Sequence, residues 1–212
     1  MAWRLLLRRC PVRSMTLVGD VAQTGSAAGA SSWAEVLTPH LGPHWRLEEL
    51  TVNYRTPAEI MAVADEVLAA GGSGGAAAQA VRSTGVQPWS LRVPEADLAD
   101  AVAGAAAEFD KEDGTLAVVV PHHRLDTIAD AVRARLPGAS DDPTAGPVVL
   151  HPAGAKGLEF DSVLVVDPAG IVEEGVRGLN DLYVALTRAT QRLGVAHPGE
   201  LPAELSGLEV RR

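Results

Sequence analysis

Runs of apolar residues alternate with amphipathic stretches along most of this chain. Continuous apolar runs predict buried strands at residues 89–93, 116–120, 148–151, 163–166 and 193–196. Between them, apolar positions spaced three and four residues apart predict helices at residues 97–109, 122–136 and 179–191. Buried strands that alternate with helices are typical of a parallel sheet covered on both faces. The predicted fold class is therefore α/β.

The first 70 residues show a less regular pattern. It predicts a short helix at 2–10, a buried strand at 15–18, a loop at 25–32, a helix at 33–37 and a strand at 46–50. A stronger helix signal follows, with Thr56 as the cap, Pro57 in the first helical position and Glu59 three residues after the cap. The apolar stripe of this helix is Ile60, Val63, Ala64, Val67 and Leu68.

A linker separates the two regions. Residues 71–80 read GGSGGAAAQA, a composition typical of linkers. We therefore place the domain boundary at residues 71–83, between a first segment at 1–70 and a second at 84–212.

Composition and charge narrow the function classes. The 212 residues include 47% hydrophobic and 4% aromatic residues, so the core is built from Ala, Val and Leu. The net charge of −9 argues against strong nonspecific electrostatic binding of nucleic acid by the chain as a whole. The single cysteine, Cys10, excludes an internal disulfide framework, and no apolar run approaches the ~20 residues of a membrane span. We expect a cytoplasmic protein without a membrane partner.

Two stretches in the first segment combine polar side chains with tight local geometry. In VGDVAQ, Asp20 and Gln23 follow a predicted strand, where open α/β sheets bind ligands. The alternative is a turn with a capping aspartate. In NYRTP, Tyr54 and Arg55 precede a helix start, so that Arg55 could reach a phosphate and Tyr54 a base. The alternative is a surface arginine and a packing tyrosine.

Two more stretches lie in the second segment. In GAKGLEFD, Gly157 allows close backbone approach and Glu159 could accept a sugar hydroxyl, whereas the alternative is a loop with a Lys156–Glu159 salt bridge. In LNDLYVALTRATQRL, Arg188 falls on a helix face away from the core stripe. It is either a surface residue or an arginine finger. Asp167 ends an apolar strand, and we interpret it as a structural polar exit.

In this order, VGDVAQ, NYRTP, AKGLEFD and LYVALTRA resemble the third to sixth motifs of superfamily-one helicases of the UvrD/Rep type. The resemblance spans roughly residues 1–196. It implies a RecA-like second motor domain at 84–212 and a remnant of the first motor domain at 1–70. It also implies an ATP-dependent DNA helicase or translocase, with ATP bound between the two domains.

The resemblance also implies residue roles. Gln23 would contact the γ-phosphate or the attacking water, Arg55 the γ-phosphate, and Arg188 would be the arginine finger. Tyr54 would stack on the adenine. Two further residues, Gly157 and Glu159, would line the nucleotide and its ribose.

The sequence departs from the family in its phosphate and magnesium elements. The phosphate loop needs Gly-x-x-x-x-Gly-Lys-Ser/Thr, but Lys111 follows an aspartate and Lys156 an alanine. No apolar strand ends in an Asp-Glu pair. We therefore expect the chain to begin just after the magnesium-binding segment of a longer protein, to obtain its magnesium site from missing first-domain residues, and to hydrolyse no ATP alone.

Two other departures resemble the HelD branch, whose members act on RNA polymerase. The segment after Gln23 holds only one aromatic residue, Trp33, and Ala153 replaces the usual histidine, with His151 displaced by two positions. The alternatives are therefore a non-catalytic module that binds RNA polymerase or a separate chain with the phosphate loop, and a truncated gene product without function.

Overall fold

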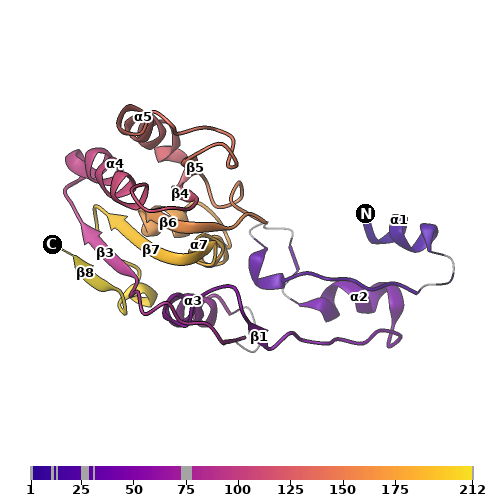
Figure 1. Ribbon diagram of the computed structural model, residues 1–212. Coiled ribbons are helices and arrows are strands. Elements are labelled where there is room, and N and C mark those ends of the chain that lie inside the picture. Colours follow the sequence, from indigo (N-terminus) through magenta and orange to yellow (C-terminus); the bar gives the residue numbers. More distant parts are fainter. Residues whose placement is uncertain are drawn as a thin grey trace.

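A computed structural model describes residues 2–10, 12, 14–24, 29–30, 32–72 and 78–211. Its main feature is a parallel sheet, which confirms the predicted α/β class (Figure 1). From edge to edge its strands are β5 (Val148–Leu150), β4 (Leu116–Val119), β6 (Phe160–Val166), β7 (Ala189–His197), β3 (Trp89–Arg92) and β8 (Glu209–Arg211). All neighbouring pairs are parallel.

Helices cover both faces of this sheet (Figure 1). They are α3 (Ala58–Ala70) and α7 (Gly178–Leu186) on one face, and α4 (Leu98–Phe109) and α5 (Leu125–Arg135) on the other. Because successive side chains of a strand point to opposite faces of the sheet, β6 packs against the helices on both faces. Val163 and Val165 pack with α3 and α7, whereas Leu164 and Val166 pack with α4 and α5.

The second segment contains the predicted strands and helices with changed boundaries. The largest change is at α7, which ends at Leu186, five residues before the predicted end at 191. β7 begins at Ala189, so residues 189–191 of the predicted helix belong to this strand. The described part of this segment also contains elements that were not predicted, namely α6 (Pro168–Glu173), the 3-10 turn η4 (Ala203–Leu205) and the edge strand β8.

The first segment differs more from the prediction. Before α3, its described elements are α1 (Ala2–Arg9), the 3-10 turn η1 (Val21–Gln23), α2 (Trp33–Leu41) and β1 (Val52–Asn53). The predicted strands at 15–18 and 46–50 are wrong, and Val18 is 88% exposed. A strand needs a neighbour for its backbone hydrogen bonds, and none of the described strands pairs with either stretch. Most of the predicted loop at 25–32 lies outside the described residues.

Helix α3 ends this segment, and four of the five positions of its predicted apolar stripe are confirmed. Ile60, Val63, Ala64 and Val67 are buried in the same hydrophobic cluster as the sheet, whereas Leu68 is only half-buried. The predicted cap is wrong, because Pro57 holds the cap position. Thr56 is buried, and its hydroxyl has no hydrogen-bond partner among the described residues.

The boundary at 71–83 stays a prediction. Residues 73–77 lie outside the described part of the chain, and β2 (Gln79–Ala80) pairs in parallel with β1. Helix α3, which precedes this stretch, packs on the sheet that follows it. Among the described helices, none is both long and apolar enough to cross a membrane.

Candidate nucleotide-phosphate site

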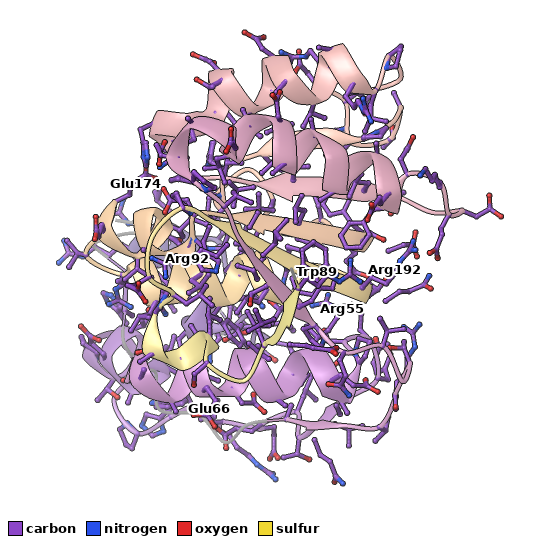
Figure 2. All side chains as sticks on the ribbon, turned by 90° about the vertical axis from the view of Figure 1, so that its left-hand side faces the viewer. Arg55, Glu66, Trp89, Arg92, Glu174 and Arg192 are labelled. Carbon is purple, nitrogen blue, oxygen red and sulfur yellow. The ribbon has the colours of Figure 1, made fainter. Side chains whose placement is uncertain are left out.

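The predicted phosphate-site residues gather at the amino-terminal edge of the sheet. Glu159 directly precedes β6, and Arg188 directly precedes β7. Figure 2 shows Arg55 on the side of Trp89, the first residue of β3, whereas Arg92, the last residue of β3, lies on the opposite side. Only Asp20 and Gln23 were expected at the carboxyl end of a strand, and the strand predicted before them at 15–18 does not form.

An ion pair joins the NYRTP and GAKGLEFD stretches. Nη1 of Arg55 lies 2.6 Å from Oε1 of Glu159. Asn53 shapes the turn that presents Arg55, because its side-chain oxygen accepts hydrogen bonds from the backbone N–H groups of Arg55 and Thr56. The structure therefore pairs Glu159 with Arg55, and the Lys156–Glu159 salt bridge that we considered is absent among the described ion pairs.

Arg188 does not lie on a helix face. It occupies the turn between α7 and β7 and is only 2% exposed, so the predicted outward direction is wrong. Its Nε donates to the carbonyl oxygen of Val184, Nη1 to that of Leu158, and Nη2 to the hydroxyl of Thr187. Through these hydrogen bonds, Arg188 holds the loop before β6 against the end of α7.

Gln23 belongs to the turn η1, which is held against α7, the helix that ends beside Arg188. Asp20 caps this turn by accepting a hydrogen bond from the Ala22 N–H, as the alternative interpretation expected, and a second one from Nε2 of Gln23. Nδ2 of Asn180, in the first turn of α7, donates a 2.6 Å hydrogen bond to the Ala22 carbonyl oxygen. Sequence reasoning missed Asn180, because an asparagine in a helical repeat carries no distinctive signal.

The other two predicted residues make fewer contacts. Tyr54 is 79% exposed, so its ring is accessible to a flat ligand. Gly157 is exposed, with φ +81°, a conformation that favours glycine, and a side chain at this position would meet open space. The structure thus brings Arg55, Glu159 and Arg188 into one cluster and leaves Tyr54 and Gly157 at the surface.

The charges of the cluster act on one another. Burial is the main cause that lowers the pKa of Arg188, and the nearby Arg55 cation lowers it further. The carboxylates of Glu159 and Asp20 raise this pKa and partly offset the two effects. Burial raises the pKa of Tyr183 to about 12, and the Asp20 carboxylate adds to this. Two neighbouring guanidinium groups repel each other, and nearby anions offset this repulsion. Such an arrangement is typical of an anion-binding site.

One atom of this cluster lacks a partner. Nε of Arg55 is buried and has no acceptor among the described residues. The single hydrogen bond to Glu159 therefore uses only part of the capacity of Arg55, and a guanidinium group binds phosphate as well as carboxylate. Among the described residues, no group of three or more His, Cys, Asp or Glu side chains is placed to hold a metal ion.

The carboxyl-terminal edge carries a separate polar network. Arg124 pairs with both Glu95 and Asp167, and Asp167 also caps α6 through the Gly170 N–H. Asp167 has the structural role that we expected from its place at the strand end. Glu174, which Figure 2 labels at this edge, accepts hydrogen bonds from two backbone N–H groups at the start of η3 (His122–Arg124).

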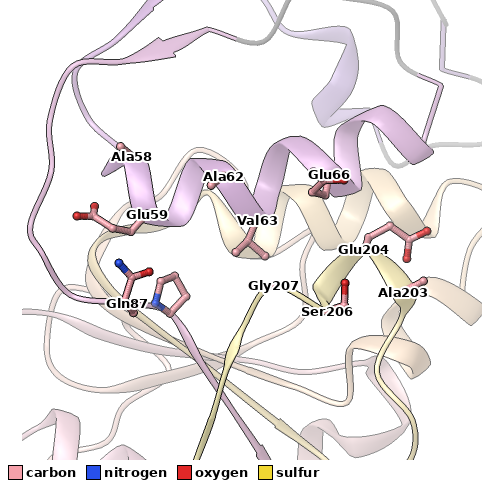
Figure 3. Close-up of a pocket in the computed structure, with 11 residues that line it drawn as sticks. Ala58, Glu59, Ala62, Val63, Glu66, Gln87, Ala203, Glu204, Ser206 and Gly207 are labelled. Carbon is pink, nitrogen blue, oxygen red and sulfur yellow. The ribbon is translucent and has the colours of Figure 1, made fainter.

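A cavity of about 660 Å³ lies between α3 and the segments at residues 87–88 and 203–207 (Figure 3). Its lining includes Glu59, Glu66 and Glu204, and none of the six predicted site residues. Hydrogen bonds from Ser83 and from the N–H groups of Thr84 and Gly85 lower the pKa of Glu59 to about 2. Because its walls are acidic, this cavity is unsuited to a polyphosphate.

Comparison with known proteins supports the fold. No protein-family model and no curated protein matches the chain. The C-terminal domain of a possible DNA helicase from Lactobacillus plantarum WCFS1 is similar in structure, with a TM-score of 0.59 and 21% identity over 76% of this chain and 100% of that one. The chain therefore shares the fold of a helicase C-terminal domain.

Two viral structures are more distant. The arterivirus nonstructural protein 10 helicase, solved with DNA, matches with a TM-score of 0.41 and 15% identity over 59% of this chain and 34% of that one. The PRRSV nsp10 helicase matches with a TM-score of 0.38 and 13% identity over 71% and 32%. At these TM-scores the matches add nothing to the assignment of the fold.

Proposed function

We propose that this chain is the carboxyl-terminal part of an ATP-dependent helicase or translocase motor of the UvrD/Rep type. The observation that carries the proposal is the convergence of Arg55, Glu159 and Arg188 from three distant stretches at one edge of a RecA-like sheet. These stretches are the ones whose sequences resemble helicase motifs. The turn that carries Gln23 is held against the first turn of α7, and the Asp20 carboxylate of this turn acts on the charge of Arg188.

In this proposal the chain supplies one wall of a split ATP site. Arg55 binds phosphate through its guanidinium group, and Arg188 adds positive charge from a fixed position. Gln23 senses the phosphate, Tyr54 stacks on the adenine, and Gly157 and Glu159 line the ribose. Positive charge that stabilises a transferring phosphoryl group can be worth about 10³–10⁵ in rate. The phosphate cradle and the magnesium ligands come from another polypeptide segment.

Mixing experiments test this division of roles. The purified chain alone is expected to hydrolyse no ATP. Addition of a polypeptide with a phosphate loop and an Asp-Glu strand, sought in neighbouring reading frames, is expected to restore hydrolysis. Arg55→Gln abolishes the restored activity, whereas Arg92→Gln, on the opposite edge, leaves it unchanged. Robust hydrolysis by the chain alone would contradict the split site.

A second candidate function is a non-catalytic module that binds RNA polymerase, as in the HelD branch. It is favoured by the net charge of −9 and by the carboxyl-terminal edge, where Arg124 is neutralised by Glu95 and Asp167. Phosphate backbones need accessible cations. Co-purification with RNA polymerase, together with no salt-sensitive binding of single-stranded DNA, would favour this candidate over the DNA motor.

A further inference from the structure

We infer that Glu159 acts as a displaceable counter-ion that holds Arg55 in readiness for a polyphosphate and competes with it. This inference rests on the proposed nucleotide site. It assigns to Glu159 a role toward Arg55 that is distinct from contact with a sugar. The ligand expected to displace Glu159 is a polyphosphate, because it carries more negative charge than one carboxylate.

The geometry of the ion pair supports displacement. The two side chains are 34% and 50% exposed, so water screens their attraction, and such pairs are weak. They join the turn before α3 to the loop before β6, 104 residues apart, so the pair holds two separate segments of the site together. The pair is therefore strong enough to orient Arg55 and weak enough to exchange.

The hydrogen bonding of Arg55 is also incomplete. Its hydrogen bond to Glu159 comes from Nη1, and the buried Nε has no acceptor among the described residues. The carboxylate therefore uses only part of the hydrogen-bonding capacity of Arg55. A polyphosphate oxygen can take the place of Oε1 at Nη1 and brings more negative charge to the guanidinium group than one carboxylate does.

Arg188 explains why the competitor must be an anion. Its three nitrogens already donate to Val184, Leu158 and Thr187, so it is fixed in place and contributes through its charge. Its charge and that of Arg55 repel each other, and Glu159 compensates both. A ligand that displaces Glu159 must therefore bring at least as much negative charge to the same position.

The test compares Glu159→Gln with the wild-type chain by isothermal titration with inorganic tripolyphosphate and, separately, with ATP. Without the competing charge, the variant is expected to bind tripolyphosphate about two- to fivefold more tightly. Arg55→Gln should lose about tenfold or more in affinity, and Arg92→Gln should match the wild type. Urea unfolding of each variant confirms that it is folded.

The outcomes separate this inference from the proposed function. If Arg55→Gln loses affinity while Glu159→Gln binds tripolyphosphate no better than the wild type, the phosphate site stands and the competitor role is wrong. A loss for ATP alone in Glu159→Gln would assign the residue to the ribose only. If Arg55→Gln equals the wild type, or if no protein binds tripolyphosphate, both the site and the inference are overturned.

Discussion

Nδ2 of Asn180 lies 2.6 Å from the carbonyl oxygen of Ala22, although 158 residues separate the two in the sequence. This hydrogen bond fastens the turn that contains Gln23 to the first turn of α7. The bond is buried, so the carbonyl group depends on it. Through α7, the proposed phosphate sensor is connected to the turn that holds Arg188.

Asn180→Ala is therefore expected to lower the free energy of unfolding by about 1–3 kcal/mol, because it leaves a buried carbonyl group without its donor. It is also expected to increase protease cleavage within residues 14–24. Urea unfolding and limited proteolysis measure the two effects. Gln87→Ala, a change at an exposed position, is the control and should stay within about 0.5 kcal/mol. Equal stability of the two variants would contradict this contact.

The buried position of Arg188 leads to a prediction on stability. Arg188→Ala removes hydrogen bonds to two carbonyl oxygens and a hydroxyl, and is expected to lower the free energy of unfolding by about 2–4 kcal/mol. Arg92→Ala removes a surface ion pair with Glu200 and should lower it by less than about 1 kcal/mol. Similar urea midpoints for the two variants would show that Arg188 is exposed in solution.

The sequence predicted the sheet and its helices because their signals are local. Buried strands such as 163–166 are continuous apolar runs, and the stripe of α3 repeats with helical spacing. The position of Arg188 could not be predicted in this way. The leucine spacing of α7 continues past its end at Leu186, where the Thr187 hydroxyl donates back to the Tyr183 carbonyl oxygen in a closing turn.

The rest of the site depends on contacts between distant residues. Nothing local in NYRTP indicates that Arg55 pairs with Glu159, or in LNDLY that Asn180 reaches Ala22. The strand at 15–18 was predicted from an apolar run, but a strand also requires a neighbour to pair with. The roles assigned to the six site residues through the helicase resemblance stay predictions.

Glycine substitutions test the backbone of the GAKGLEFD loop. Gly157 has φ +81°, and Gly157→Ala is expected to destabilise the protein by about 1–2 kcal/mol, because an alanine is strained in this conformation. Gly104 lies inside α4, and open space surrounds the position of an added side chain. Gly104→Ala is expected to stabilise by about 0.5–1 kcal/mol. Thermal and urea unfolding of both variants measure this contrast, and a stabilising Gly157→Ala would argue against the loop conformation.

The lowered pKa of Glu59 predicts a dependence of stability on pH. The group has a pKa of about 2 in the folded protein against an ordinary value of 4.5, mainly because Ser83 donates a hydrogen bond to its carboxylate. Its stabilising contribution is therefore fully present above about pH 4.5 and is lost as the pH falls toward 2. Glu59→Gln should be less stable than the wild type at pH 7, and the difference should narrow over this range. Glu66→Gln, on the same helix, is the matched control, and a gap that stays constant from pH 7 to the acid limit would contradict the prediction.

Equilibrium binding of ATP to the purified chain tests the central claim most directly. Isothermal titration should show that the wild type and Arg92→Gln bind ATP alike, and that Arg55→Gln binds about tenfold or more weakly because a charged phosphate contact is lost. Tyr54→Ala should weaken ATP binding about fivefold or more through loss of base stacking, while leaving tripolyphosphate binding unchanged. Equal ATP affinities for all four proteins, or no binding by any of them, would contradict the assignment of this edge of the sheet as one wall of an ATP site.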